Sequence, residues 1–218
     1  MNMNKTFNIF RHNGPRYWNI AALDTAANED YLTAIEKDVI LEMNKVRTNP
    51  KKYAELYIQP RLRYYNGKYY SMPGLVPVLT QEGTAAVNDC IAALNRSNGI
   101  GILNPVKGLS LAAKDHATDQ SRTGQIGHNG SDSSTPEVRL RRYGAFDGSW
   151  ANGENIVYGA ITGKDIVIAL LIGDGVPERG HRINIMNRAF TQTGTGFGTH
   201  PRYETLCTIN YTNGYTSN

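Results

Sequence analysis

The stretch of sequence that organises this chain is GDGVPERGHRINI, residues Gly173–Ile185. It follows an apolar run from Asp165 to Ile172, whose composition predicts a short buried helix. Three glycines and one proline then turn the backbone, so that Asp174 and His181 come within eight residues of each other. The pattern predicts a loop that presents a carboxylate and an imidazole.

A second polar pair, His128 and Glu154, stands upstream in equally glycine-rich surroundings. The loop GQIGHNG has three glycines in seven residues, which is incompatible with a helix or a regular strand and lets the backbone bend around His128. Glu154 belongs to a segment, 150–159, that reads as a turn entering a strand. We expect His128 and Glu154 to converge with Asp174 and His181 on one cleft.

Composition narrows the class of protein. The chain has 218 residues, of which 40% are hydrophobic, enough for one well-buried domain, although length alone also permits two small ones. The net charge is +4, and basic and acidic residues alternate, so no basic stripe of the nucleic-acid-binding type is present. The nearest candidate, Arg139–Arg142, is expected to be a solvated helix face with local salt bridges.

The chain shows no repeat and no low-complexity linker, which favours a single domain over 28–218. Residues 1–27 are rich in Asn and lack periodicity, so we expect a mostly irregular N-terminal arm. No run of sequence approaches transmembrane length. The first 22 residues hold no apolar core of signal-peptide type, which leaves open a cytosolic protein or one whose export signal lies outside this sequence.

Hydrophobic periodicity and capping signals predict several helices and one pair of strands. A long tyrosine-rich loop is expected over 59–78, with aromatic packing favoured over a ligand surface. The strands, 193–199 and 205–212, alternate in polarity and are expected to pair antiparallel. The expected helices cover 30–47, 50–57 after the cap Asn49, 81–96 after the cap Thr80, 108–123, about 136–143, and 165–172 after the cap Thr162.

The remaining histidines favour structural roles. His116 lies among small apolar residues in the middle of a helix, which is typical of a core histidine bonded to a carbonyl group, and His12 and His200 are expected at the surface. His128 and His181 are too far apart in sequence to form a local metal motif.

The two cysteines, Cys90 and Cys207, lie on predicted regular elements far apart in sequence. They can form a disulfide if the chain is exported, or remain two buried thiols if it is not.

The segments Gly153–Ile156 and Arg179–Ile185 together resemble the CAP superfamily, which comprises cysteine-rich secretory, antigen 5 and pathogenesis-related proteins and a large bacterial branch. Further similarities follow in the same order as in the family. They are the end of the opening helix at Asn44–Arg47, the Ala112–His116 element, the glycine-rich loop ending in His128, and the strand Gly194–Gly198. The resemblance covers about 30–211.

This resemblance implies an α+β fold, a CAP-type α-β-α sandwich with a small antiparallel sheet between helical layers. It places His128, Glu154, Asp174 and His181 around a large cleft. In relatives the two histidines bind zinc or a similar metal, and Glu154 and Asp174 would either bind the metal as well or orient a histidine that does. Asp174 departs from the family, which usually has the longer Glu after a Trp, where Leu171 stands here. The resemblance also implies an extracellular or cell-envelope location and a Cys90–Cys207 disulfide.

Three functions are compatible with these residues. The first is an extracellular module whose cleft binds a divalent metal, with zinc preferred, and docks a ligand or protein partner. The alternative is a metal-dependent hydrolase for peptide or cell-wall substrates, with Glu154 or Asp174 as candidate catalytic groups. A second alternative, lipid or sterol binding, rests on the family alone. No nucleophile or oxyanion loop is visible in the sequence, which favours the binding module over an enzyme.

Overall fold

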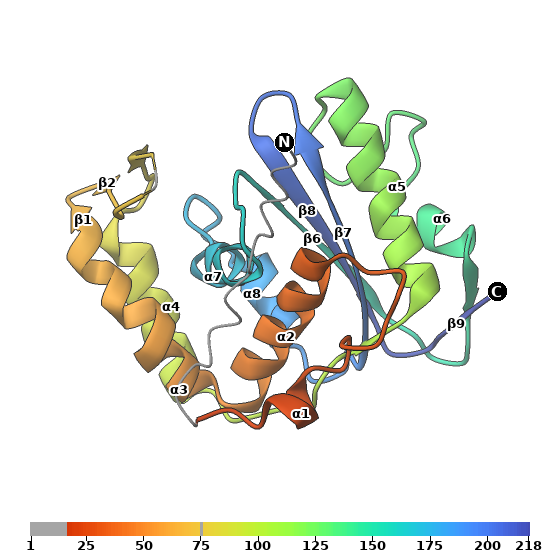
Figure 1. Ribbon diagram of the computed structural model, residues 1–218, viewed down its shortest axis with the longest axis horizontal. Coiled ribbons are helices and arrows are strands. Elements are labelled where there is room, and N and C mark those ends of the chain that lie inside the picture. Colours follow the sequence, from red (N-terminus) through yellow and green to blue (C-terminus); the bar gives the residue numbers. More distant parts are fainter. Residues whose placement is uncertain (1–16, 75) are drawn as a thin grey trace, which may run out of the picture.

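The computed structural model describes residues 17–74 and 76–218, and it has the α+β architecture of an α-β-α sandwich (Figure 1). The central sheet has the order β4-β7-β8-β6. Its strands are β4 (Asn104–Pro105), β6 (Asn152–Tyr158), β7 (Gln192–His200) and β8 (Glu204–Thr212). The pairs β7–β8 and β6–β8 are antiparallel, and β4 adds to β7 in parallel. The predicted closing strand pair is therefore confirmed, and β6 is an edge strand.

One face of the sheet is covered by α5 (Lys107–Thr123), seen at the right of the strands in Figure 1. Two glycines of β7 let this helix approach closely. A Cβ atom on Gly194 would lie 2.2 Å from the backbone nitrogen of Ser110, and one on Gly196 would lie 2.5 Å from the carbonyl carbon of Ala113. Only residues without a side chain fit at these contacts.

The opposite face is covered by α2 (Ala34–Thr48) and α7 (Gly163–Ile172), with α4 (Thr84–Arg96) packed outside them. The helix α2 begins in a reciprocal capping box between Thr33 and Glu36. The second carboxylate oxygen of Glu36 accepts a hydrogen bond from the Phe197 backbone N–H at 3.0 Å, which ties the helix to β7. The cap predicted at Thr162 for α7 is confirmed.

The main hydrophobic core lies between the sheet and this second layer of helices. Its large apolar side chains come from α2, the turns after it, α4, α7 and the strand β8. The following are fully buried: Ile40, Met43, Tyr53, Ile58, Leu94, Ile166 and Tyr211. The remaining elements are α1 (Ile20–Leu23), α3 (Pro50–Tyr53), a π-helical turn (Ala54–Ile58), a 3-10 helix (Gln59–Tyr64), α6 (Pro136–Arg141), α8 (Gly180–Ile185), β5 (Gly144–Phe146) and β9 (Tyr215–Ser217). Strand β5 pairs antiparallel with β9.

The described part of the N-terminal arm contacts the domain. Leu23 is buried, its carbonyl accepts a hydrogen bond from Asn44 Nδ2 at 2.9 Å, and Trp18 donates to the Tyr57 hydroxyl at 3.0 Å. Residues 1–16, including His12 with its predicted surface position, lie outside the described residues.

The segment expected to be a long loop contains regular structure. After the 3-10 helix it forms a small antiparallel sheet of β1 (Tyr65–Asn66), β2 (Tyr69–Tyr70) and β3 (Val78–Leu79). The predicted cap at Thr80 is also wrong, because α4 begins at Thr84 and the Thr80 hydroxyl instead donates to the Lys68 carbonyl at 2.6 Å. The Thr80 side chain bonds across to Lys68, so it does not cap the helix that follows.

Three further observations concern single residues. His200 is 2% exposed rather than at the surface, because its Nδ1 accepts backbone N–H groups of the β7–β8 turn. The disulfide expected between Cys90 and Cys207 is absent, since both are free and buried in the core, and burial raises the pKa of the Cys90 thiol to about 11. Among the described residues, no helix is long and apolar enough to cross a bilayer.

Candidate functional site

The centre of the candidate site is a buried ion pair that carries an exposed histidine. Glu154 on β6 accepts a hydrogen bond from His128 Nδ1 at 2.8 Å with one carboxylate oxygen, and from Arg139 at 2.7 Å with the other. The side chains of Glu154 and Arg139 are each 2% exposed, whereas that of His128 is 51% exposed. The carboxylate therefore fixes the His128 ring from behind while the far side of the ring faces solvent.

Arg139 is a site residue that the sequence does not reveal. The cluster Arg139–Arg142 predicts a solvated helix face, and Arg141 and Arg142 do lie there in surface ion pairs with Glu137 and Asp132. Arg139 instead points inward and also donates to the carbonyl groups of Ser134 and His128. No local pattern separates it from the other two arginines. The available signal is the need of a buried carboxylate for a counter-charge.

A second set of hydrogen bonds supports the loop that presents His128. The Gly127 carbonyl accepts from Gln120 Nε2 at 2.6 Å and lies 2.8 Å from His116 Nε2. The Gly127 N–H donates to the Tyr158 hydroxyl at 3.0 Å, and this hydroxyl donates to Gln120 Oε1 at 2.9 Å. His116 is fully buried, and burial lowers its pKa. The predicted core role of His116 is thus confirmed.

His181 reaches the site from the other side of β6. It is the second residue of α8, and its carbonyl accepts a hydrogen bond from Asn155 Nδ2 at 3.0 Å. Asn184, one turn later, donates to Asn155 Oδ1 at 2.9 Å and to the Glu154 carbonyl at 3.4 Å. These bonds fasten α8 to the same strand residues that hold His128.

The segments that carry the two histidines are both bonded to the edge strand β6. Successive side chains of a strand point to opposite faces, so Glu154 faces the His128 loop and Asn155 faces α8. Among the described residues β6 is the outermost strand of this sheet, so both segments contact the same edge. Burial lowers the pKa of His181, and the charge of His128 lowers it further.

Asp174, the fourth predicted site residue, has a different set of partners. Its two carboxylate oxygens accept the backbone N–H groups of Gln81 and Glu82, each at 2.8 Å. These amides precede α4, so Asp174 joins the 173–185 loop to that helix. The structure therefore joins His128 to Glu154 and bonds the His181 backbone to the next strand residue, Asn155, but commits the Asp174 carboxylate to backbone amides.

The loop is held further by a pair of arginines. Arg179 donates to Glu82 through its two terminal guanidinium nitrogens, at 2.7 and 2.6 Å, and to Asp89 through Nε at 3.1 Å. Arg182 pairs with Asp89 as well, at 2.5 Å. Arg179 has a φ of +55°, a conformation that non-glycine residues adopt rarely. Its several bonds to fixed groups offset this strain directly before Gly180–His181.

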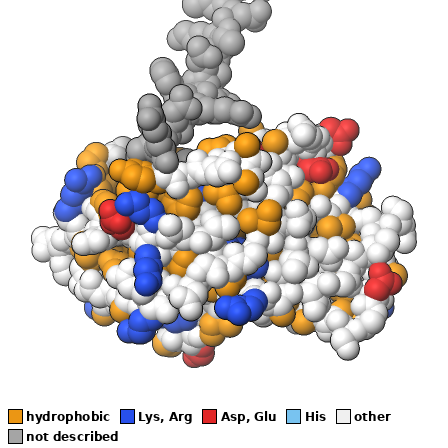
Figure 2. Space-filling view, turned by 90° about the horizontal axis from the view of Figure 1, so that it is seen from below, with side chains coloured by type: hydrophobic (Ala, Val, Ile, Leu, Met, Phe, Trp, Pro, Cys, Tyr) orange, Lys and Arg blue, Asp and Glu red, His pale blue; other side chains and the backbone are white. Residues whose placement is uncertain are grey.

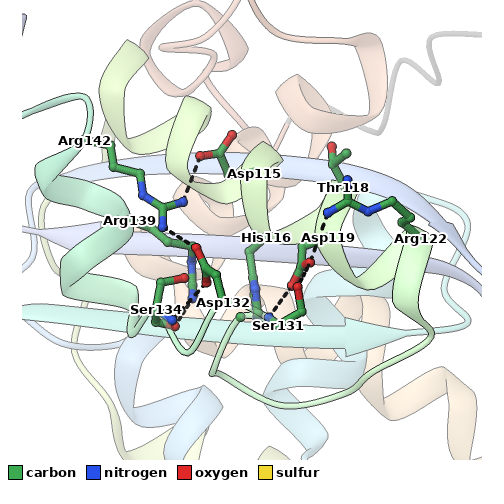
Figure 3. A pocket seen from close by; sticks show the side chains of 11 residues that line it. Asp115, His116, Thr118, Asp119, Arg122, Ser131, Asp132, Ser134, Arg139 and Arg142 are labelled. Carbon is green, nitrogen blue, oxygen red and sulfur yellow. Dashed lines mark hydrogen bonds and ion pairs between the residues drawn. The ribbon is translucent and has the colours of Figure 1, made fainter.

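A cavity of about 320 Å³ lies behind the site, between α5, α6 and the loop that follows His128 (Figure 3). Its charged side chains are largely used in internal pairs. Arg142 binds Asp132 at 2.6 Å, and Asp119 accepts the Ser131 N–H at 2.7 Å. Hydrogen bonds from Ser134, and then from Arg142, hold the pKa of Asp132 well below its usual range. These contacts fix the loop that carries His128.

The donor set can be compared with the needs of a metal. Neutral imidazoles are common zinc ligands, and a carboxylate that accepts a hydrogen bond from the ring of one of them is a frequent arrangement in zinc sites. Within residues 17–74 and 76–218, no group of three or more His, Cys, Asp or Glu side chains is placed to hold a metal ion. Since Glu154 and Asp174 are both engaged elsewhere, His128 and His181 remain as the only two candidate ligands among the four predicted residues.

Comparison with known proteins gives the family. Residues 41–211 match the model of the family described as CAP, the cysteine-rich secretory protein family. A search among curated proteins finds no match. An extracellular protein containing an SCP domain from Bacillus anthracis is similar in structure, with 24% identity and a TM-score of 0.42 over 51% of this chain and 34% of that chain. An outer surface protein from Borrelia burgdorferi is similar as well, with 20% identity and a TM-score of 0.43 over 56% and 83%.

The matched chain spans about a third of the Bacillus anthracis protein. The family assignment rests on the match of residues 41–211, which is well over half of the 218 residues and contains every predicted site residue. The chain therefore belongs to the CAP family, the cysteine-rich secretory proteins.

Proposed function

We propose that this chain is an extracellular or cell-envelope binding module, whose His128–His181 pair takes a divalent cation, zinc above all, together with a ligand or partner surface. The observation that carries this proposal is the bond from His128 Nδ1 to the buried Glu154. In the neutral ring this bond leaves the Nε2 lone pair on the exposed side. Family membership supports the extracellular location.

Glu154 acts in this proposal by orienting His128. Both of its oxygens already accept short hydrogen bonds, so direct coordination would break either the bond that orients His128 or the buried pair with Arg139. The same engagement counts against a general-base role, which favours a binding module over the hydrolase alternative. A divalent cation bound here would supply positive charge for an anionic or carbonyl group of a ligand.

Two protein ligands leave further coordination positions for water or for atoms of a partner. Such a site binds its metal less tightly than a closed four-ligand site, and the metal and the partner bind more tightly together than separately. We expect zinc affinity to rise when the partner is present.

Isothermal titration calorimetry with zinc alone tests the proposal. His128→Ala and His181→Ala are each expected to weaken binding at least tenfold. Glu154→Gln is expected to weaken it about 10- to 100-fold, as other changes behind a metal-bound histidine do. The matched control is Asp174→Asn, which removes a carboxylate from the same loop and should leave the zinc affinity within about twofold.

Circular dichroism of each variant separates lost binding from lost structure, and His128→Ala is the most informative because His128 is exposed. Equal zinc affinity in the original protein and in both histidine variants would refute the cation site. If Asp174→Asn weakened zinc binding as strongly as His181→Ala, the assignment of the cation site to the two histidines alone would be wrong.

A further inference from the structure

The three-stranded sheet β1–β3 projects from the body of the molecule beyond α4, at the upper left of Figure 1. Its apolar side chains are unusually exposed. The exposed fractions are 83% for Val76, 63% for Leu79, 60% for Tyr69 and 53% for Val78. Exposed apolar side chains that gather at one place mark a surface that contacts something other than water.

The register of the sheet brings some of these side chains together. Tyr69 on β2 lies directly opposite Leu79 on β3, and residues opposite each other in an antiparallel pair project from the same face. Val76 and Val78 continue the same segment of chain. Each strand has only two residues, and Val78, opposite Tyr70, projects from the other face. The small sheet therefore exposes apolar side chains on both of its faces.

The charge of this segment is one-sided. From Leu56 to Gln81 the sequence contains Arg61, Arg63 and Lys68 and no Asp or Glu. Arg61 is held by Asp165 and by the Tyr70 hydroxyl. Arg63 and Lys68 are exposed, and neither side chain forms an ion pair within the part of the chain that the structure describes. Two free positive charges therefore flank the exposed apolar residues.

The underside of the molecule, which faces away from the projection in Figure 1, also carries basic side chains. Figure 2 views the molecule from below, and basic side chains gather among hydrophobic ones over its left half, which is the side of α3 and α4 in Figure 1. On α3, at this end of the molecule, Lys51 is exposed and Lys52 is half-buried. The acidic residue that follows the projection in the sequence, Glu82, is paired with Arg179.

We propose that the projection β1–β3 docks on the interface of an anionic lipid bilayer. The exposed Val76, Leu79 and Tyr69 enter the boundary between headgroups and acyl chains, and Arg63 and Lys68 bind the lipid phosphates. Tyrosine suits this depth because its ring is apolar and its hydroxyl is polar. The segment contains four tyrosines, at positions 64, 65, 69 and 70.

Size and charge favour a bilayer over a protein partner. A specific protein interface takes about 20–30 residues on each side, whereas four apolar side chains on a narrow projection are enough for shallow insertion into a membrane surface. The absence of acidic residues from Leu56 to Gln81 removes the repulsion that an anionic surface would impose.

Co-sedimentation with lipid vesicles tests the proposal. We expect the protein to bind vesicles made of equal parts of phosphatidylcholine and phosphatidylglycerol, to bind pure phosphatidylcholine far more weakly, and to be released at high ionic strength. Val76→Asp and Leu79→Asp should each reduce partitioning at least tenfold. Arg63→Gln and Lys68→Gln should each reduce it about fivefold on the anionic vesicles alone.

Ile161 supplies a matched control, because it is 55% exposed and lies outside the projection. Ile161→Asp should leave partitioning unchanged. A direct readout comes from Val76→Trp, whose added emission should shift to the blue with anionic vesicles, whereas that of Ile161→Trp should not. The proposal is overturned if the protein does not bind anionic vesicles, which would point to a protein partner, or if Ile161→Asp weakens binding as much as Leu79→Asp.

Discussion

Replacing Arg139 with Met is the sharpest test of how the site is held together. The substitution removes three contacts, to Glu154 at 2.7 Å, to the Ser134 carbonyl at 2.8 Å and to the His128 carbonyl at 3.0 Å. It leaves the Glu154 carboxylate 2% exposed with His128 as its one remaining side-chain partner. Breaking a buried ion pair by removing one member costs about 3–5 kcal/mol, because the other charge stays buried without compensation.

A loss of this size is large for a single domain. At about 2–4 °C per kcal/mol for a chain of this length, Arg139→Met should lower the melting temperature by about 10 °C. Urea unfolding at neutral pH, followed by circular dichroism, measures the free energy directly. The control is Arg141→Met, because Arg141 forms an exposed pair with Glu137 and should change the free energy of unfolding by less than about 0.5 kcal/mol.

The variants Arg139→Met and Glu154→Gln, singly and combined, form a double-mutant cycle that measures the interaction between the two side chains. Removing both charges avoids the unpaired carboxylate, so the double variant should be more stable than the sum of the single losses by about 2–3 kcal/mol. Additive losses, or an Arg139→Met variant within about 1 kcal/mol of the original protein, would refute the reasoning that Glu154 depends on Arg139.

Three other predictions follow from single positions. Gly196→Val should destabilise the protein by about 3 kcal/mol or more in thermal unfolding, because its Cβ would lie 2.5 Å from the backbone of α5; Gly101→Ala, with nothing within 4 Å, is the neutral control, and equal losses would contradict the packing. Hydrogen bonds from Arg179 lower the pKa of Glu82 from 4.5 to about 2, so the stabilisation by this ion pair is fully present above about pH 4.5 and is lost as the pH falls toward 2. In Glu82→Gln the melting temperature should depend less on pH in that range. A pH profile equal to that of the original protein would count against this role of Glu82. Cys90 and Cys207 should resist a thiol reagent in the native protein, and both should react after unfolding without reductant. If no thiols reacted after unfolding, the two cysteines would be shown to form a disulfide.

Local sequence patterns determined most of the fold. The helical spacing of apolar residues located α2, α4, α5 and α7, and the alternation after Gln192 located β7 and β8. These patterns act over a few residues, so they can be read without knowing what packs against them. The order of the motifs along the chain also indicated the family, which the match of residues 41–211 confirms.

The site could be predicted only in part. His128 and His181 stood out because glycine-rich loops present them, and Glu154 because it opens a strand. Arg139 could not be found, since whether one arginine in a cluster turns inward depends on a carboxylate 15 residues away and on a strand edge that the sequence does not display.

The tertiary structure alone decided the partners of the polar side chains. Asp174 lies in the predicted loop, yet its carboxylate is taken by backbone amides 92 and 93 positions away. Cys90 and Cys207 occupy the same core without bonding. The sequence by itself determined which elements form, because helix and strand periodicity are local properties. It did not determine which buried charge meets which partner, because those pairings depend on how distant elements pack and on which groups water can no longer reach.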